Sequence, residues 1–204
     1  MVDLFNYTRR TSSVAHIGAI DLGGDNPIRI QSMTTTNTND TEACVRQAEE
    51  IIKAGGELVR CTTQGSREAE NMKNINAGIR ADGYQTPLVA DVHFNPNVAD
   101  VAALYCEKVR VNPGNYVDPA RKFIKQEYTD EEYAHELQKI EDRFVPFLNI
   151  CKEHHTAIRI GVNHGSLSDR IRNRYGDTPE GIVESCLEFL RICKKENFHD
   201  VVIS

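Results

Sequence analysis

The sequence predicts an α/β fold of the TIM-barrel type, with about six parallel strands and a short β-hairpin before them. Three observations support this prediction: short apolar runs alternate with helical patterns, polar residues end nearly every apolar run, and no GxGxxG motif follows the first strand. Alternating strands and helices imply right-handed βαβ units in a parallel sheet. The absent glycine motif disfavours a dinucleotide-binding sheet. Either a doubly wound sheet or a barrel fits the alternation, and the barrel is preferred because polar residues end nearly every strand.

The apolar runs give the expected strands. Residues 14–25 have the pattern of a two-stranded hairpin, which we expect to form a lid before the sheet. Six strands follow, at residues 27–33, 57–62, 87–94, 107–112, 156–163 and 199–204. A closed barrel usually needs eight strands and about 250 residues. We therefore expect residues 1–204 to be the N-terminal part of one barrel domain, truncated after about six strands.

Start and stop signals mark the helices between these strands. The first is expected from Asn39-Asp40 to Gly55-Gly56, and the second from about Ser66 to Ile79. The third should begin with Asn95 as N-cap and Pro96 in the first helical position, where a missing N–H costs nothing. Each helix thus follows directly on a predicted strand.

Two later helices have distinctive sequences. Thr129 and Glu132 form a capping box before a long charged helix, which we expect Pro146 to kink or split into a surface pair. The last helix opens at Thr178. Its expected apolar side consists of Ile182, Val183, Cys186, Leu187, Leu190 and Cys193.

Composition excludes several classes of protein. The net charge of −6 argues against general nucleic-acid binding. The chain has no run of about 18 apolar residues and no apolar N-terminal segment typical of a signal peptide. The six cysteines contain no CxxC pair, so neither a disulfide framework nor a metal site is expected among them. We expect a cytoplasmic protein without a membrane partner.

Polar residues gather at the ends of neighbouring strands. Residues i and i+2 of a strand share a face. Asp91 and His93 therefore share one face of their strand, and so do Arg110 and Asn112. The same spacing relates Arg159, Gly161 and Asn163, and Arg60 stands at the same stage of the second strand. In a barrel these positions meet at the carboxyl-terminal mouth, where binding and catalytic groups lie.

Three arginines around one opening favour a phosphate ligand. The guanidinium group is planar and always charged, and it can hold phosphate through two parallel hydrogen bonds. Three such groups suggest a ligand with at least two phosphates, and backbone amides of residues 112–115 and 163–166 can add donors. A structural interpretation stays open, in which Asp91 simply pairs with Arg60 or Arg110.

At these residues the sequence resembles a known family. The segments IRIQSMTTTNTNDT, AGGELVRC, PLVADVHFN, KVRVNPGN and IRIGVNHGSLSDR occur in the order and spacing of the (E)-4-hydroxy-3-methylbut-2-enyl diphosphate synthases, called IspG or GcpE. The resemblance runs over almost the whole chain. The connection containing YTDEEYAHELQKIEDRFVP is similar to that of the long, three-domain form found in plants and some bacteria.

The resemblance implies a specific reaction and site. The family reductively opens 2-C-methyl-D-erythritol 2,4-cyclodiphosphate in the non-mevalonate (MEP) isoprenoid pathway, using a [4Fe-4S] cluster and electrons from ferredoxin or flavodoxin. The cluster ligands are expected outside this chain, together with the remaining strands, the insert domain and the C-terminal domain, so this segment alone should be inactive. The implied substrate-binding residues are Arg60, Asp91, His93, Arg110, Asn112, Arg159, Asn163 and, less closely, Ser166. Asp91 and His93 would orient the substrate or relay a proton.

Two other functions fit the residues. A cluster-free, phosphate-binding transferase of the dihydropteroate-synthase type also carries Asp, Asn and Arg at strand ends. A non-catalytic module could instead use open strand edges to pair with another chain, and the same edges lead us to expect a homodimer.

Overall fold

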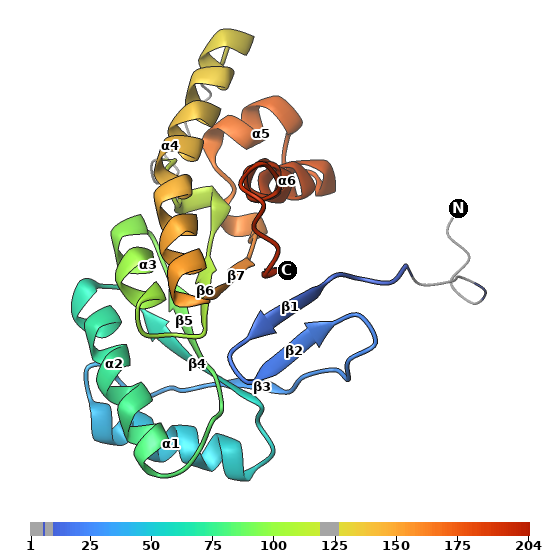
Figure 1. Ribbon diagram of the computed structural model, residues 1–204. Helices are drawn as coiled ribbons and strands as arrows, with labels where there is room; N and C mark the ends of the chain where they lie inside the picture. Colours follow the sequence, from blue (N-terminus) through green and yellow to red (C-terminus); the bar gives the residue numbers. More distant parts are fainter. Residues whose placement is uncertain (1–5, 7–9, 119–126) are drawn as a thin grey trace.

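The computed structural model describes residues 6, 10–118 and 127–204 (Figure 1). Most of the N-terminal segment for which we expect no signal peptide lies outside the described residues, as does part of the long connection after residue 118. The six parallel strands pair in their sequence order, which confirms the truncated TIM-barrel fold. They are β3 Gln31–Met33, β4 Leu58–Thr63, β5 Leu88–Val92, β6 Lys108–Val111, β7 Ala157–Ile160 and β8 Val201–Ile203.

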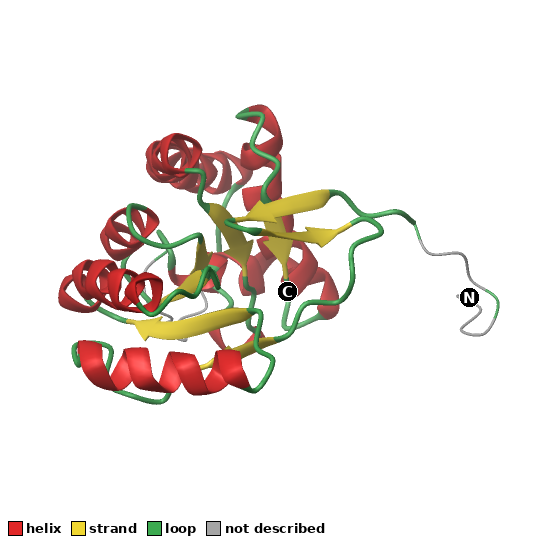
Figure 2. Ribbon diagram, turned by 60° about the horizontal axis from the view of Figure 1, so that its bottom comes forward, coloured by secondary structure: helices red, strands yellow, loops and turns green. Residues whose placement is uncertain are grey.

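The hairpin consists of β1 Val14–Ile17 and β2 Ile20–Gly23, which pair antiparallel as expected. It closes the amino-terminal end of the sheet's inner face, so it does not cover the polar strand ends. Ile17 is fully buried there in a small apolar cluster with Leu58, Val89 and Ala157. Figure 2 shows the hairpin as a separate ribbon beside the main sheet. The hairpin thus provides an apolar floor for the half-barrel.

The helices lie against the other face of the sheet (Figure 1). Asp40, Asn95 and Thr178 act as N-caps, each accepting a hydrogen bond from a backbone amide of the first helical turn, as predicted. The helices are α1 Thr41–Lys53, α2 Ser66–Ala81, α3 Pro96–Ala103, α4 Asp130–His154, α5 Asp169–Tyr175 and α6 Pro179–Lys195. Two short 3-10 turns, η1 Pro113–Asn115 and η2 His164–Ser166, follow β6 and β7.

Helix α4 differs from its prediction. The capping box of Thr129 and Glu132 is present, but the helix runs through Pro146 without being split and forms no helix pair. Its inner face explains the continuity: Phe144 and Phe147 are fully buried on either side of the proline. Burying each such ring contributes roughly 1.5–3 kcal/mol, which offsets the hydrogen bond that Pro146 cannot make.

Helix α6 follows its predicted apolar side only in part: Cys193 is buried, and Cys186 and Leu190 pack against the core. Val183 and Leu187 are exposed, at 55% and 36%, whereas Phe189 is buried. Glu188, also buried, forms an ion pair with Arg170 of α5. Because α5 was not predicted, the pattern of apolar residues alone wrongly placed Val183 and Leu187 on the buried side and missed Glu188.

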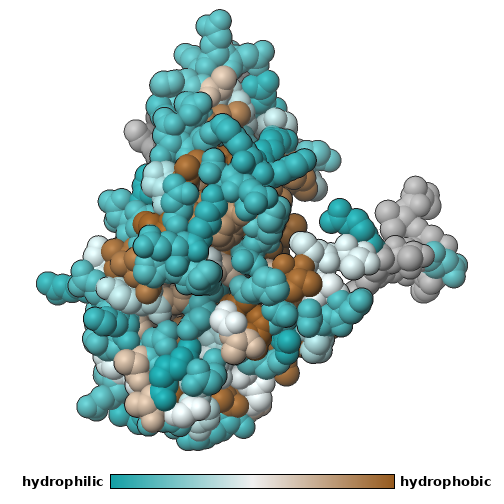
Figure 3. All heavy atoms as spheres, viewed as in Figure 1, coloured by the Kyte–Doolittle hydropathy of each residue, from teal (hydrophilic) through white to brown (hydrophobic). Residues whose placement is uncertain are grey.

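Both edges of the sheet are open among the described residues. β3 and β8 each pair on one side only, and apolar residues stand exposed near both: Ile28 at 93%, Ile30 and Ile203 at 59%. In Figure 3 the surface is largely hydrophilic, with small hydrophobic areas, one of which lies close to the hairpin. Within the described ranges, we find no helix with the length and apolar character to span a membrane.

The open edges generate a prediction about association. We expect the 204-residue chain to dimerise or to be marginally stable, because strand edges with exposed apolar side chains pair readily. Ile203→Lys should reduce self-association in sedimentation velocity runs, since a charge on the edge opposes strand pairing. Val183→Lys, on the exposed side of α6, is the matched control. A monomeric wild-type chain that melts like a closed barrel would contradict the prediction.

Candidate functional site

The polar strand ends form one row on the inner face of the sheet. Asp91 of β5 pairs in register with Arg110 of β6, which pairs with Arg159 of β7. The alternating neighbours Val109 and Val111 are fully buried in the core on the other face. The period of two residues in the strands therefore places these three charged side chains side by side, as the sequence predicts.

Asp91 is the centre of the cluster. Its side chain is 3% exposed and accepts hydrogen bonds from Arg60 on one neighbouring strand and from Arg110 Nη1, at 3.2 Å, on the other. His93 Nε2 lies 3.1 Å from Asp91 Oδ2. One carboxylate thus orients two arginines and an imidazole, as in the structural interpretation of the sequence, and the arginines keep further donors for a ligand.

Glycine makes room for Arg110. A Cβ atom on Gly161 would lie 2.5 Å from Arg110 Nε. Arg110 Nη2 instead donates to the carbonyl oxygen of Gly161 at 2.8 Å. Arg159 has no contact with Asp91; its Nε donates to Ser204 Oγ at 2.8 Å. The predicted residues on β4 to β7 therefore come together, but Arg159 does so without an acidic partner among the described residues.

The two asparagine-glycine loops pack against each other above this row. Asn112 Oδ1 accepts from the amide of Gly114 at 3.1 Å, and Asn112 Nδ2 donates to Ser166 Oγ at 2.7 Å. Asn163 Oδ1 accepts from the amide of Gly165 at 2.9 Å. A Cβ on Gly114 would lie only 1.8 Å from the carbonyl oxygen of Ser166. Asn112, Asn163 and Ser166 thus shape the loops through their own hydrogen bonds.

The cluster carries an excess of positive charge. Burial lowers the pKa of Arg159, and Arg60 and Arg110 lower it further. Burial also lowers the pKa of Arg110, which Asp91 opposes and Arg60 reinforces. Arg60 Nε is buried without a hydrogen-bond acceptor. Three arginines face one carboxylate, so the arrangement is suited to an anionic ligand.

Sequence reasoning missed two features near the site. Arg170 of α5 is buried and donates to both oxygens of Glu188, at 2.7 and 2.8 Å, and to Asp118 at 3.1 Å. The Tyr133 hydroxyl donates to Glu188 at 2.5 Å. This network ties the segments that follow both loops to α4 and α6. Lys108 is the second feature: it lies two residues before Arg110, a spacing that could have revealed it.

The described residues do not fit an iron–sulfur cluster. They contain no group of three or more His, Cys, Asp or Glu side chains placed to hold a metal ion. All six cysteines are free. Burial raises the pKa of Cys61 to about 11 and that of Cys193 to about 12, so these thiols resist forming the thiolate that binds iron.

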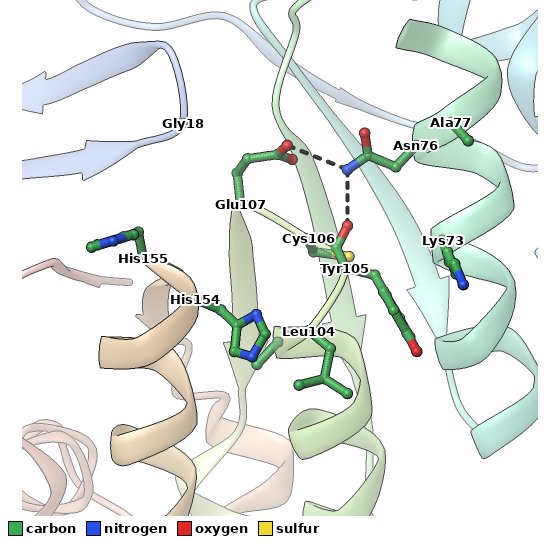
Figure 4. A pocket seen from close by; sticks show the side chains of 11 residues that line it. Gly18, Lys73, Asn76, Ala77, Leu104, Tyr105, Cys106, Glu107, His154 and His155 are labelled. Atoms are coloured by element: carbon green, nitrogen blue, oxygen red, sulfur yellow. Dashed lines mark hydrogen bonds between the residues drawn. The ribbon is translucent and has the colours of Figure 1, made fainter. Parts of the chain in front are cut away.

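A separate pocket of about 430 Å³ lies at the opposite, amino-terminal end of the strands. Figure 4 shows Glu107 accepting from Asn76, with His154 and His155 at the end of α4 nearby. Glu107 also accepts from Arg80 and from the amide of Leu88. Its hydrogen bonds join neighbouring elements, so this pocket is less suited to a diphosphate than the arginine row.

Comparisons with known proteins identify the family. The model of the GcpE TIM-barrel domain matches residues 11–204. Proteins called 4-hydroxy-3-methylbut-2-en-1-yl diphosphate synthase (flavodoxin) are 76% identical in Phocaeicola vulgatus and 75% in Bacteroides thetaiotaomicron, each over 203 residues. These alignments cover 100% of this chain and 33% of each relative. The chain thus spans about a third of the length of these curated relatives.

Among solved structures, a truncated 3-deoxy-D-arabino-heptulosonate 7-phosphate synthase from Thermotoga maritima aligns with a TM-score of 0.58 at 9% identity. The alignment covers 95% of this chain and 56% of that chain, and it supports the fold alone. The family assignment depends on the sequence matches, which extend over nearly the whole chain and include every strand of the arginine row. On that evidence, the chain belongs to the GcpE family and lies within its TIM-barrel domain.

Proposed function

We propose that this chain holds the substrate in a protein that reductively opens 2-C-methyl-D-erythritol 2,4-cyclodiphosphate to (E)-4-hydroxy-3-methylbut-2-enyl diphosphate. The observation that carries the proposal is the arginine row around Asp91, with its excess of positive charge and the unpaired Nε of Arg60. The names of the relatives support this reaction and a place in isoprenoid biosynthesis.

The contribution of this chain is positioning. Arg60, Arg110 and Arg159 would neutralise the two phosphates, and the amides of the two glycine loops would add donors. Holding the diphosphate at fixed points presents the ring C–O bond in one orientation, which lowers the entropy cost of the reaction. Asp91 and His93 would orient the substrate or relay a proton, since both lie at the edge of the same row.

The redox chemistry belongs elsewhere in this proposal. A [4Fe-4S] cluster would supply the electrons for ring opening, but the residues here do not fit one. We place its ligands, the remaining barrel strands and the other domains outside this chain. Flavodoxin, which the relatives' name contains, or ferredoxin would be the electron donor. The chain alone would be inactive, and the intact protein would work in the cytoplasm.

Family membership favours one of the candidate functions. A dihydropteroate-synthase-type transferase is disfavoured, because nearly all of the chain matches the GcpE domain. The binding-module function has one supporting observation, the open edges β3 and β8. It predicts association without a response to ligand, so the titration below separates it from substrate binding.

Calorimetric titration of the chain with the cyclic diphosphate should give saturable binding. Arg110→Ala should weaken this binding roughly 10- to 100-fold, because a charge-assisted hydrogen bond contributes about 1.5–3 kcal/mol. Asp91 keeps its contacts with Arg60 and His93 in this variant, so folding should persist.

Arg191→Ala is the matched control, since Arg191 is exposed on α6 and pairs with Glu184. Its binding should equal that of the wild-type chain, and thermal melts should show that both variants fold. The absence of a heat change in the folded wild type, or equal binding by Arg110→Ala, would contradict the proposal.

Gly114→Ala tests whether the packed loops matter for binding. The new Cβ collides with the Ser166 carbonyl, so the loops must separate, at a cost of about 1–3 kcal/mol in the free energy of unfolding. The Gly114→Ala variant should also bind the cyclic diphosphate more weakly, because the separated loops no longer hold their backbone amides in place. Gly165→Ala is the control, because its Cβ would meet only Asn163 Oδ1, at 3.3 Å. Equal thermal stability and affinity in both variants would show that the loop contact is dispensable.

A further inference from the structure

Lys108 occupies the inner face of the half-barrel directly below the arginine row. It is the first residue of β6, two residues before Arg110, and it is only 2% exposed. In the sheet register it pairs with Val89 and Ala157, both members of the apolar floor. Its charged end is therefore enclosed between an apolar layer and the row of arginines.

The ammonium group has little to compensate its charge. Lys108 Nζ donates to Gln31 Oε1 at 3.2 Å, and no carboxylate pairs with it in the described ranges 10–118 and 127–204. An ammonium has three donors, and buried lysines are rare unless they are paired. Gln31 is neutral, so the charge of Lys108 stays uncompensated within these residues.

A second, independent observation points to an anionic ligand at the same level. Val89 pairs in register with Arg60 on one side and with Lys108 on the other. Arg60 Nε is one of four buried side-chain polar atoms that lack a hydrogen-bond partner among the described residues. Two cationic side chains thus flank the same residue of β5, and both have unused donors.

The charged groups facing Lys108 reinforce this view. They are Arg60 on β4, Asp91 on β5, His93 just after β5, Arg110 on β6 and Arg159 on β7. The oxygens of Asp91 already accept from Arg60 and Arg110 and lie beside His93. Asp91 therefore has little capacity left to neutralise a fourth cation.

The geometry points to Lys108 as the fourth cationic ligand of the diphosphate site, binding a phosphate oxygen from the floor together with Arg60 Nε. This inference rests on the proposed function, and it adds a residue that is neither among the substrate-binding positions implied by the resemblance nor in the strand-end pattern. The deeper phosphate would contact Lys108 and Arg60, and the outer one would face Arg110 and Arg159.

The environment of Lys108 gives the inference a measurable signature. Burial, with added repulsion from Arg159 and Arg60, lowers its pKa to about 8. A bound phosphate favours the charged ammonium and raises that pKa again. Above pH 8 the free site has lost the proton, so binding must take one up, and affinity must fall as the pH rises through 8. A guanidinium group stays charged throughout this range.

The test is a calorimetric titration of the intact encoded protein with the cyclic diphosphate between pH 7 and pH 9.5. Near pH 8.5 it is repeated in two buffers of different ionisation enthalpy, which measures proton uptake. The wild type should take up protons and bind more weakly at higher pH. Lys108→Met should bind roughly 10- to 100-fold more weakly at pH 7, without proton uptake and without this pH dependence.

Lys73→Met is the matched control, because Lys73 is exposed on α2 and lines the pocket at the opposite end of the strands (Figure 4). It should behave as the wild type. Wild-type affinity and proton uptake in Lys108→Met would overturn the inference and leave the proposed function intact. No binding by the wild type would overturn both.

A melting experiment without ligand separates binding from a structural role. Removing an unpaired buried charge should leave the melting temperature of Lys108→Met unchanged or raise it. A lower melting temperature would show that Lys108 stabilises the fold of the free protein, which would also overturn the inference.

Discussion

The site depends on the buried carboxylate of Asp91. Two arginines, one from each neighbouring strand, and an imidazole converge on its two oxygens. Two guanidinium groups that are close together repel each other strongly where water is excluded. The carboxylate of Asp91 offsets this repulsion between Arg60 and Arg110, because it is a counterion for both. The carboxylate also fixes the direction of each guanidinium, which is the preorganisation that diphosphate recognition requires.

The remainder of the fold serves to keep that carboxylate dry and its neighbours aligned. Ile17 of the hairpin closes the floor, and the register of β5, β6 and β7 sets the row. Gly161 leaves space for Arg110, and Gly114 lets one loop lie directly on the other. The Arg170–Glu188 pair then anchors α5, which follows the second loop, to α6. A ligand at the strand ends would therefore contact side chains whose positions are fixed by the hairpin, by the strand register and by the packed loops.

Local sequence rules predicted the features that depend on residues close together in the sequence. The spacing of Asp91 and His93 gave their common face, and the cap residues Asn95 and Thr178 gave the helix starts. The rules were wrong where contacts between residues far apart in the sequence determine the structure. Pro146 lies in an unbroken helix because Phe144 and Phe147 pack on the core. Glu188 is buried because Arg170 lies across from it, which no periodicity in α6 reveals.

Burial has opposite consequences for the free and the bound site. Enclosing Lys108 and Arg110 with a single carboxylate raises the free energy of the empty site, because desolvation penalises each charge. The same low dielectric strengthens the attraction of these groups for a phosphate. Functional sites commonly give up stability in this way. Burial of the cationic groups is thus the common physical cause of two effects: it lowers the stability of the free protein, and it raises the affinity that we propose for a diphosphate.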